Sequence, residues 1–318
     1  MLRKIFTFSV ISFCYVFISF STLMAADKST NLRLALLPIP DVLPIYLAQE
    51  KGYFAELGIN VETLPVGSGV ERDQLMQAGR IDGMINELSG AASFNRETVQ
   101  VQVIATARLP IGDAPLFRIL GAPGSGLRRV SDLAAIPIGI SMNTVIEYIT
   151  DRLLAAGGVS DEAVKYKSIP VLPERLQLLL SGQVKAVTLP DPLAASALAA
   201  GAVEIVNDTT LANISASVIT FSVKSLKDKD DAVKKFMAAW DRAAADLNNA
   251  PADYKLLMLS KIRVPKNIRA TFSIPPFPRR TLPSREQWRD AMTWMVEKKL
   301  LKKPLAYEDS VTAKYLLK

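Results

Sequence analysis

The 318-residue chain contains no histidine and a single cysteine, Cys14. These absences exclude Ser-His-Asp and Cys-His nucleophile arrangements, and they exclude metal sites built on histidine or cysteine ligands. Carboxylate and lysine chemistry remains open, so catalysis is the minority interpretation and we expect neither a metal nor a cofactor. A chain of this length buries a core that needs no disulfide.

The chain has only one apolar stretch long enough to cross a bilayer, at residues 5–24. Two basic residues precede this stretch, two alanines follow it, and Ser, Thr and Cys residues interrupt it. The pattern predicts a secretory signal peptide over residues 1–25 that is cleaved, in preference to an uncleaved anchor. Cys14 follows the bulky Phe13, which makes it a poor site for lipid attachment. We therefore expect a freely diffusing protein outside the cytoplasm, in the periplasm of a double-membraned bacterium.

The chain also lacks a strong excess of basic or of acidic residues. Two of the 38 basic residues lie in the leader, so 36 face 31 acidic residues in the rest of the chain. The basic residues are densest at residues 298–303, where no aromatic residues are interleaved with them. This pattern is typical of a solvated helix end, and we expect no nucleic-acid partner.

Short apolar segments alternate with amphipathic segments that end at glycine from residue 32 onward, a pattern typical of a parallel α/β sheet. The roughly 293 residues left after the leader favour two domains over one. The strand expected at 116–120 leaves a first α/β set, and the strand expected at 218–223 returns to it after a second set. Two such connections predict two lobes, 26–118 plus 222–318 and 119–221, with a hinge and a cleft between them.

Five polar segments follow an expected strand and precede an expected helix. At such places helix N-termini present free N–H groups, and ligands collect beyond the carboxyl ends of the strands. Three segments would come from the first lobe and two from the second, as closure around a solute requires. The five segments are 38–44, 66–71, 86–89, 141–144 and 190–192.

Each candidate in these segments also has a purely structural interpretation. Ser89 and either Asn143 or Thr144 fit helix N-caps, each worth about 1 kcal/mol without any ligand. The sequence 67–69, Gly-Ser-Gly, fits an anion cradle but lacks the lysine and spacing of a phosphate loop. Asp191 lies between two prolines and fits a rigid turn or a ligand contact equally well. Arg108, at the end of a strand, fits either a partner for an anionic ligand or a surface arginine.

The same segments carry a resemblance to a known family. The sequences LPIYLAQEKGYFAELGINV (43–61), LMQAGRIDG (75–83), SDLAAIPIGISMNTVIEYITDRLL (131–154) and ERLQLLLSGQVKAVTLPDPLAASALAAGA (174–202) occur in that order. The segment IPPFPRRTLPS with a Trp-containing helix follows them near the C-terminus. In order and spacing these motifs resemble the substrate-binding proteins of ABC importers in the nitrate, sulfonate, taurine and thiamine-pyrimidine-precursor branch.

The resemblance implies an α/β periplasmic binding fold of type II. Each of its two lobes has a mainly parallel sheet flanked by helices, and two crossing strands form the hinge. It also implies a monomer that captures one small solute and delivers it to an ABC permease in the inner membrane. The alternatives are a solute sensor that docks on a receptor, and an enzyme on the same fold similar to a thiamine-pyrimidine synthase or a chorismate dehydratase.

Cleft positions of the family map onto this chain segment by segment. Asn86 and Glu87 depart from the small residues often found at their place, and the carboxylate of Glu87 argues against a simple sulfonate or nitrate as ligand. We therefore expect a small polar organic solute, a class that includes heteroaromatic compounds. With Arg108 added, the predicted ligand-binding residues are Pro40, Asp41, Ser68, Gly69, Asn86, Glu87, Ser89, Arg108, Ser141, Asn143, Thr144 and Asp191.

Overall fold

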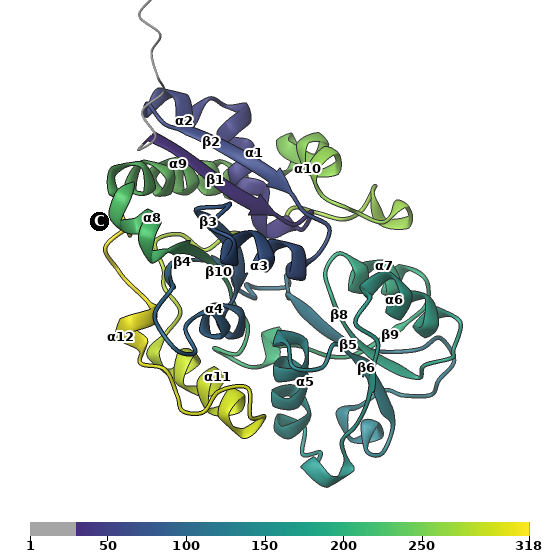
Figure 1. Ribbon diagram of the computed structural model, residues 1–318. Coiled ribbons are helices and arrows are strands. Elements are labelled where there is room, and N and C mark those ends of the chain that lie inside the picture. The colour runs from purple at the N-terminus through teal and green to yellow at the C-terminus, as the bar shows by residue number, and fades with distance from the viewer. Residues whose placement is uncertain (1–29, 318) are drawn as a thin grey trace, which may run out of the picture.

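The computed structural model describes residues 30–317, so the predicted signal peptide and Cys14 lie outside the described residues. The chain forms two five-stranded sheets that lie beside each other, each flanked by helices (Figure 1). Within the described residues, none of the helices combines the length and the apolar character needed to cross a bilayer.

The first sheet has the strand order β2-β1-β3-β10-β4. Strand β1 pairs parallel with β2 and with β3, whereas β10 pairs antiparallel with both β3 and β4. Four strands therefore run in one direction and β10 runs against them, as a mainly parallel sheet requires. The strands are β1 (Asn31–Leu36), β2 (Asn60–Pro65), β3 (Gly83–Glu87), β4 (Val101–Arg108) and β10 (Ser217–Ser222).

The second sheet repeats this arrangement with the order β7-β6-β8-β5-β9. Here β5 is the strand that runs against the other four, because it pairs antiparallel with β8 and β9. The predicted lobe boundaries at 118/119 and 221/222 fall inside β5 and β10. The strands are β5 (Phe117–Gly121), β6 (Pro137–Ile140), β7 (Lys165–Ser168), β8 (Ala186–Pro190) and β9 (Val203–Asn207).

Helices cover both faces of each sheet, and we call each sheet with its helices a lobe. The second lobe carries α5 (Val145–Ala156), α6 (Leu172–Leu180) and α7 (Leu193–Ala199). The first lobe carries α1 (Leu43–Glu50), α2 (Tyr53–Glu56), α3 (Gly69–Gln77), α4 (Leu88–Phe94), α8 (Val223–Asp228), α9 (Asp230–Asn249), α10 (Lys255–Lys261), α11 (Arg285–Glu297) and α12 (Tyr307–Ser310).

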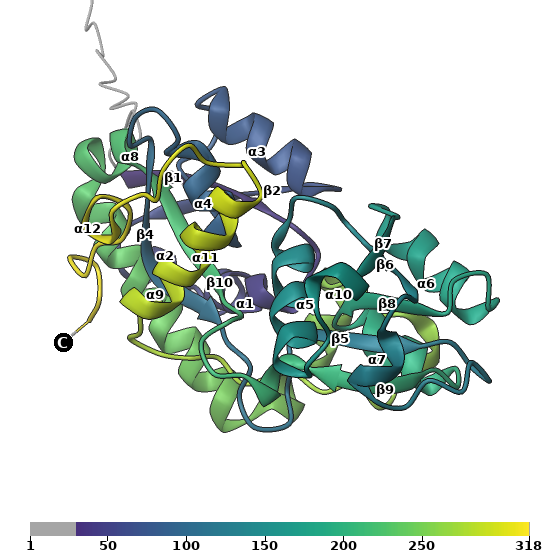
Figure 2. The same cartoon turned by 90° about the horizontal axis from the view of Figure 1, so that it is seen from below.

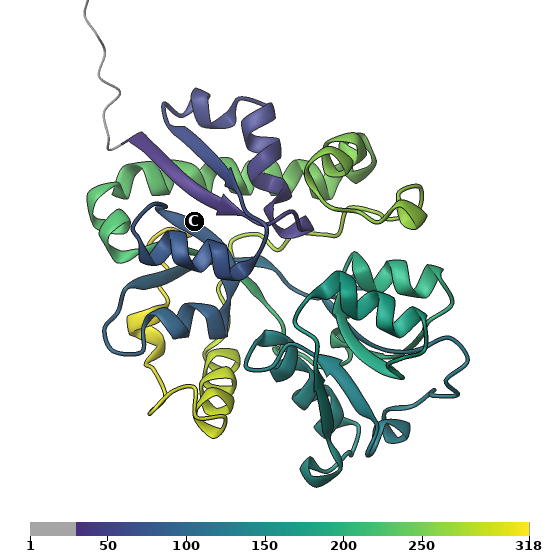
Figure 3. The same cartoon turned by 45° about the vertical axis from the view of Figure 1, so that its right-hand side comes forward.

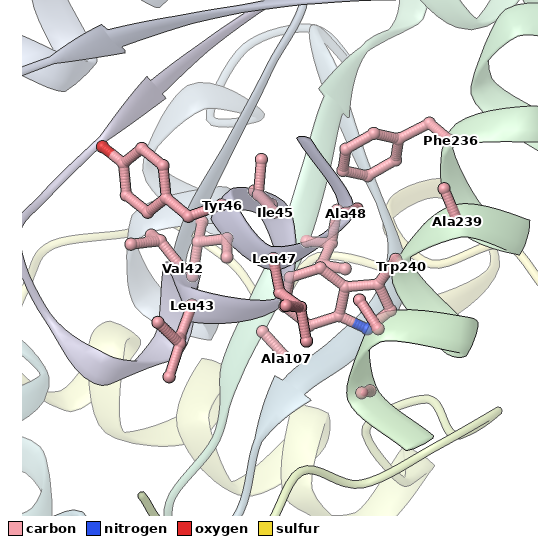
Figure 4. Packing of buried hydrophobic residues seen from close by; sticks show 14 of the residues in the cluster. Val42, Leu43, Ile45, Tyr46, Leu47, Ala48, Ala107, Phe236, Ala239 and Trp240 are labelled. Atoms are coloured by element: carbon pink, nitrogen blue, oxygen red, sulfur yellow. The ribbon is translucent and has the colours of Figure 1, made fainter. Parts of the chain in front are cut away.

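One apolar core fills the space between the first sheet and the helices α1 and α9. Figure 4 shows Leu47 and Ala48 of α1 close to Trp240 of α9, with Phe236 on the preceding turn of α9. Phe236 also stacks on Phe54 and meets Phe221 of β10 edge to face, at ring distances of 5.8 and 5.5 Å. This core fixes α1, and so the turn that leads into it, against the sheet.

A second apolar core extends across both lobes. It includes Met84 and Val103 of the first sheet, Trp294 of α11, and Ile149 and Leu153 of α5 in the second lobe. A third core lies in the second lobe alone, between its sheet and the helices α6 and α7. The two lobes are therefore joined by apolar packing as well as by the chain.

Two segments of the chain cross between the lobes, residues 109–116 after β4 and residues 208–216 before β10. Figure 3 shows them passing through the narrow region between the two sheets. The sequence predicts two crossings, but it predicts them as crossing strands, whereas β5 and β10 each lie within one sheet and the crossing segments are outside the strands.

The start of α4 differs from the sequence expectation. Residues 86–89 were expected to open a helix with Ser89 as its cap, but Asn86 and Glu87 end strand β3, and the N-cap position is Glu87. The strand is longer because β10 pairs with it as far as the Ser217–Glu87 position. Long-range pairing of this kind overrides a local capping signal.

Candidate ligand-binding site

A cavity of about 160 Å³ lies between the lobes, and we call it the interlobe cavity. Both lobes supply its walls, which are mostly apolar but contain three carboxylates and one guanidinium group. It is lined by Leu37, Ile39, Asp41, Glu87, Arg108, Leu116, Phe117, Val145, Ile146, Leu172, Pro190, Asp191, Ala216 and Ser217.

Three adjacent strands place a row of polar side chains along one side of this cavity. Ser217 at the start of β10 is opposite Glu87 at the end of β3 and opposite Arg108 at the end of β4. Neighbouring strands lie about 4.8 Å apart, so the three residues follow one another at that spacing. The buried Ser217 Oγ has no hydrogen-bond partner in the protein. The row therefore offers a carboxylate acceptor, a hydroxyl group and a guanidinium donor to one ligand.

Arg108 is buried, with 2% of its surface exposed, which excludes the surface-arginine alternative. Its Nη1 donates to Asp41 Oδ1 at 3.1 Å, and its Nη2 donates to the carbonyl of Pro115 at 3.4 Å. Asp41 is itself only 7% exposed, so the pair is desolvated on both sides. The Arg108 Nε atom is buried without a partner. Most of the charge of Arg108 is thus matched inside the protein, while one N–H group stays available.

Glu87 is paired with an arginine from α3. Arg72 Nη2 lies 3.6 Å from Glu87 Oε2, while its Nη1 donates to the carbonyl of Ile85 and its Nε to Asp73, both at 2.9 Å. Burial raises the pKa of the Glu87 carboxyl above its usual value, although the positive charge of Arg72 opposes this. Glu87 is therefore a carboxyl that a donor-bearing ligand would help to ionise.

Asn86 lies beside Glu87 with an unused donor. Its Oδ1 accepts from Thr220 Oγ1 at 2.6 Å, but its buried Nδ2 has no partner. Gly90 leaves the space next to both side chains, because a Cβ there would lie 3.3 Å from Glu87 Oε2 and 3.4 Å from Asn86 Nδ2. A larger residue at position 90 would crowd both groups.

The second lobe contributes Asp191, in the turn between β8 and α7. Its carboxylate pairs with Arg118, which also donates to Glu204 at 2.7 Å. Asp191 Oδ1 accepts from the backbone N–H of Ala195 at 3.1 Å, so it caps α7 as well. Burial raises the pKa of Asp191, with Arg118 opposing the change. The sequence left a structural and a ligand role open for Asp191, and its position supports both.

The remaining predicted residues do not line the interlobe cavity. Pro40 is buried in the one-turn helix η2 (Pro40–Val42) beside Asp41. Ser68 is exposed and caps α3 by accepting from Glu71 N, with Gly69 as the first helical residue. Ser89 lies in the first turn of α4, and Thr144 caps α5 by accepting from Ile146 N at 3.1 Å. Of the twelve predicted residues, the cavity lining thus contains Asp41, Glu87, Arg108 and Asp191.

Arg175 organises the loop at 141–144 and is not among the residues predicted from the sequence. It is fully buried and donates to the carbonyls of Ile169 and Thr188 at 2.8 and 2.7 Å, and to Ser141 Oγ. Burial lowers its pKa to about 10. The sequence did contain a signal for its burial: Arg175 is four residues before Leu179, so both lie on the apolar face of an amphipathic helix.

Asp208 joins the two crossing segments of the hinge. It is completely buried, and its two carboxylate oxygens accept from the backbone N–H groups of Leu116 and Phe117 at 3.0 and 3.1 Å. Burial raises its pKa to about 6, while these hydrogen bonds and the charge of Arg108 oppose the rise. The protonation state of the Asp208 carboxyl at the hinge is therefore expected to change as the pH passes through about 6.

This pKa predicts a pH dependence of stability. A carboxyl with a raised folded-state pKa stabilises the fold below its unfolded value near 3.8, and the contribution is lost as the pH rises through about 6. Relative to Asp208→Asn, the wild type should therefore lose free energy of unfolding between pH 4 and pH 7, by up to about 3 kcal/mol. Urea titrations at several pH values measure this difference, with the exposed Asp253→Asn as control. Parallel curves for wild type and Asp208→Asn would contradict the assignment.

Two contacts hold the lobes together on opposite sides of the interlobe cavity. On one side, α5 packs on α11, and we call this contact the clasp (Figure 2). On the other, Ser196 of α7 exchanges two hydrogen bonds with Asn267 of η7 (Lys266–Ile268), at 2.8 and 3.0 Å.

The clasp is built from polar contacts around an aromatic pair. Tyr148 and Trp294 meet at a ring distance of 5.5 Å. Trp294 Nε1 donates to Asp151 at 2.7 Å. Lys298 Nζ lies 2.7 Å from Glu147 and 3.0 Å from Asp151. Asp290 accepts from Tyr148 at 2.7 Å and from Arg152 at 2.8 Å.

The groups around the interlobe cavity can bind a small molecule through hydrogen bonds and apolar contacts. Across residues 30–317, no cluster of three or more acidic, histidine or cysteine side chains is placed to hold a metal ion. Each guanidinium at the cavity is already paired with a carboxylate. The site is therefore suited to hydrogen bonding and apolar enclosure of a small molecule.

Comparisons with known proteins give a family match and a fold match. A family model described as NMT1/THI5 like matches residues 39–254. The chain is 30% identical over 104 residues to 4-amino-5-hydroxymethyl-2-methylpyrimidine phosphate synthase THI11 of Saccharomyces cerevisiae, which covers 33% of this chain and 29% of the synthase. The chain thus matches less than a third of the length of these curated relatives.

Solved structures of the same fold cover most of the chain. The periplasmic aliphatic sulphonate binding protein SsuA of Escherichia coli has a TM-score of 0.74 at 15% identity, over 87% of this chain and 96% of that one. A ligand-binding component of an ABC-type import system from Staphylococcus aureus has a TM-score of 0.73 at 13% identity, over 90% and 98%. The likeness confirms the predicted two-lobed periplasmic binding fold.

Proposed function

Because this chain belongs to the NMT1/THI5-like family, we propose that it is a solute-binding protein that captures one small polar organic molecule between its lobes. The observation that carries the proposal is the interlobe cavity, to which both lobes contribute and along which Glu87, Ser217 and Arg108 form a polar row. Closure of two lobes around a solute is a known motion of such architectures.

The charges around the cavity favour a solute that is not a simple anion. Asp41, Glu87, Asp191 and Asp208 supply four carboxyl groups, against three guanidinium groups from Arg72, Arg108 and Arg118. A sulfonate or nitrate would meet no unmatched positive charge there. A neutral molecule with N–H or O–H donors would bind Glu87 and accept from Arg108, and Phe117 and Leu116 would enclose an aromatic ring.

The proposal includes export and delivery. The leader at 1–25 would direct the protein to the periplasm, where it would act as a monomer and release its solute to an ABC permease. A sensor role is the first alternative, and genes for a permease and an ATPase beside this one would favour import, whereas a neighbouring histidine kinase would favour sensing.

The second alternative is an enzyme, as the match to the yeast synthase suggests. The chain has no histidine, and its only cysteine lies in the leader, so histidine- or cysteine-dependent chemistry has no groups to use. We therefore propose that the protein binds its solute without converting it. Turnover of a bound metabolite by the purified protein would reverse this assignment.

Native mass spectrometry of freshly purified protein is the direct test of solute capture. We expect a non-covalent adduct of a few hundred daltons, because tightly bound solutes survive gentle purification. The absence of any adduct, together with no thermal stabilisation by a broad solute library, would contradict the proposal.

Glu87→Ala tests the polar row. Removing a charged hydrogen-bond partner costs about 1.5–3 kcal/mol, so the affinity for the identified solute should fall at least tenfold. Isothermal titration calorimetry measures the change, and Glu50→Ala, an exposed position at the end of α1, is the matched control. Unchanged affinity in Glu87→Ala would remove this residue from the site.

A further inference from the structure

The interlobe cavity is too small to hold a typical organic ligand alone. Its volume is about 160 Å³, whereas small-molecule sites usually measure about 300–1,000 Å³. A second cavity of about 520 Å³ adjoins it. Arg108 and Asp191 line both cavities, so the two share a wall made of these side chains. We call the second cavity the side chamber.

The side chamber lies between the lobes as well. Helix α7 of the second lobe forms one wall through Ala195 and Ala199, and residues 268–276 of the first lobe form the other with Phe272 and Ile274. The hydrogen bonds between Ser196 and Asn267 fix the two walls against each other. The small alanine side chains on α7 leave the space open, because any larger residue there would fill part of it.

The arginines of the side chamber are paired within the protein, and the remaining charged residue of its lining, Asp113, is exposed to solvent. Arg118 pairs with Asp191 and Glu204, and Arg108 pairs with Asp41. Away from this shared wall, Phe272, Ile274 and the adjoining prolines make the lining apolar. A ligand group placed there would gain from apolar burial and would meet no unpaired positive charge.

We propose that the side chamber binds an apolar extension of the solute whose polar end occupies the interlobe cavity. The solute is then an elongated molecule with a polar, hydrogen-bonding head and an uncharged apolar tail. The tail passes between Arg108 and Asp191, and closure of the lobes encloses both ends. This inference rests on the proposed solute-binding function and narrows its substrate class.

A homologous series of simple probes tests the proposal. Acetamide, butanamide and hexanamide share a head that donates to Glu87 and accepts from Arg108, and they differ only in tail length. Burial of each methylene should tighten binding about fourfold. Dissociation constants from ligand-observed NMR titration of the purified protein should therefore fall steadily along the series. Equal constants for the three amides would overturn the proposal.

Substitutions on α7 test whether the apolar tail of the solute occupies the side chamber. Ala199→Trp and Ala195→Phe fill the side chamber, and we expect them to abolish the gain from butanamide to hexanamide while acetamide binds as in the wild type. Ala200→Trp is the matched control, since residue 200 is exposed and does not line the chamber. A similar loss in the control and in the filled variants would overturn the proposal.

The outcomes separate this inference from the proposed function. Acetamide binding that Glu87→Ala abolishes, without any dependence on tail length, supports the interlobe site and rejects the side chamber. Failure of all three amides to bind also rejects the chamber, whereas solute capture is then judged by the adduct in native mass spectrometry.

Discussion

Arg108→Met is expected to lower the free energy of unfolding by about 3–5 kcal/mol and to abolish solute binding. Removing one member of a buried ion pair leaves the other charge desolvated and unpaired. Here the unpaired group is Asp41, and the charge of Arg108 also favours the ionised forms of Asp191 and Asp208. Urea denaturation measures the loss as a shift of the midpoint at constant slope.

A second substitution separates the ion pair from the rest of the site. Arg108→Met combined with Asp41→Leu removes both charges, so much of the lost stability should return, whereas solute binding should not. Arg263→Met changes an exposed arginine and serves as the control. A loss below about 1 kcal/mol in Arg108→Met would show that Asp41 is hydrated or protonated without its partner.

Trp294→Ala is expected to lower the free energy of unfolding by about 3–5 kcal/mol and to move the lobes apart. Trp294 is 1% exposed and packs in the core that extends across both lobes, and removal of a buried tryptophan side chain costs this amount. The variant also loses the hydrogen bond to Asp151 and the edge contact with Tyr148. Small-angle X-ray scattering should show a larger radius of gyration for the folded variant.

Trp288→Ala is the matched control for the clasp. Trp288 lies on the same helix and is equally buried, but its Nε1 donates to the carbonyl of Leu305 within the first lobe. We expect a comparable loss of stability and an unchanged radius of gyration. An equal change of radius in both variants would mean that α11 stabilises the first lobe without holding the second.

The sequence predicted the fold because its signals are local and periodic. Short apolar segments followed by helices that end at glycine predict strands at 32–37, 137–140 and 186–189, and the observed bounds of β1, β6 and β8 differ from these by at most one residue. The end of β3 was misplaced because pairing with β10, more than 120 residues away, determines it. No local pattern at residues 86–89 records that partner.

The site was only partly accessible to the same reasoning. Of the residues that line the interlobe cavity, Asp41, Glu87 and Asp191 were predicted because they follow expected strands, and Arg108 because it ends one. Arg72, Arg118 and Arg175 were not found, since each comes from a helix or strand interior and is directed to the site by tertiary packing. The pairing of carboxylates with arginines, which sets the charge of the cavity, is therefore visible only in the fold.

The unequal construction of the two interlobe contacts gives the protein a preferred entrance. Opening at the clasp would expose Trp294 and the apolar core around it to water, whereas opening at α7 breaks the two hydrogen bonds between Ser196 and Asn267 and separates the single half-buried alanine Ala195 from the first-lobe core. The lobes should therefore separate first at α7, while the clasp between α5 and α11 stays closed. Solute would enter past α7, and the rate of capture would depend on how often the two lobes separate at this helix.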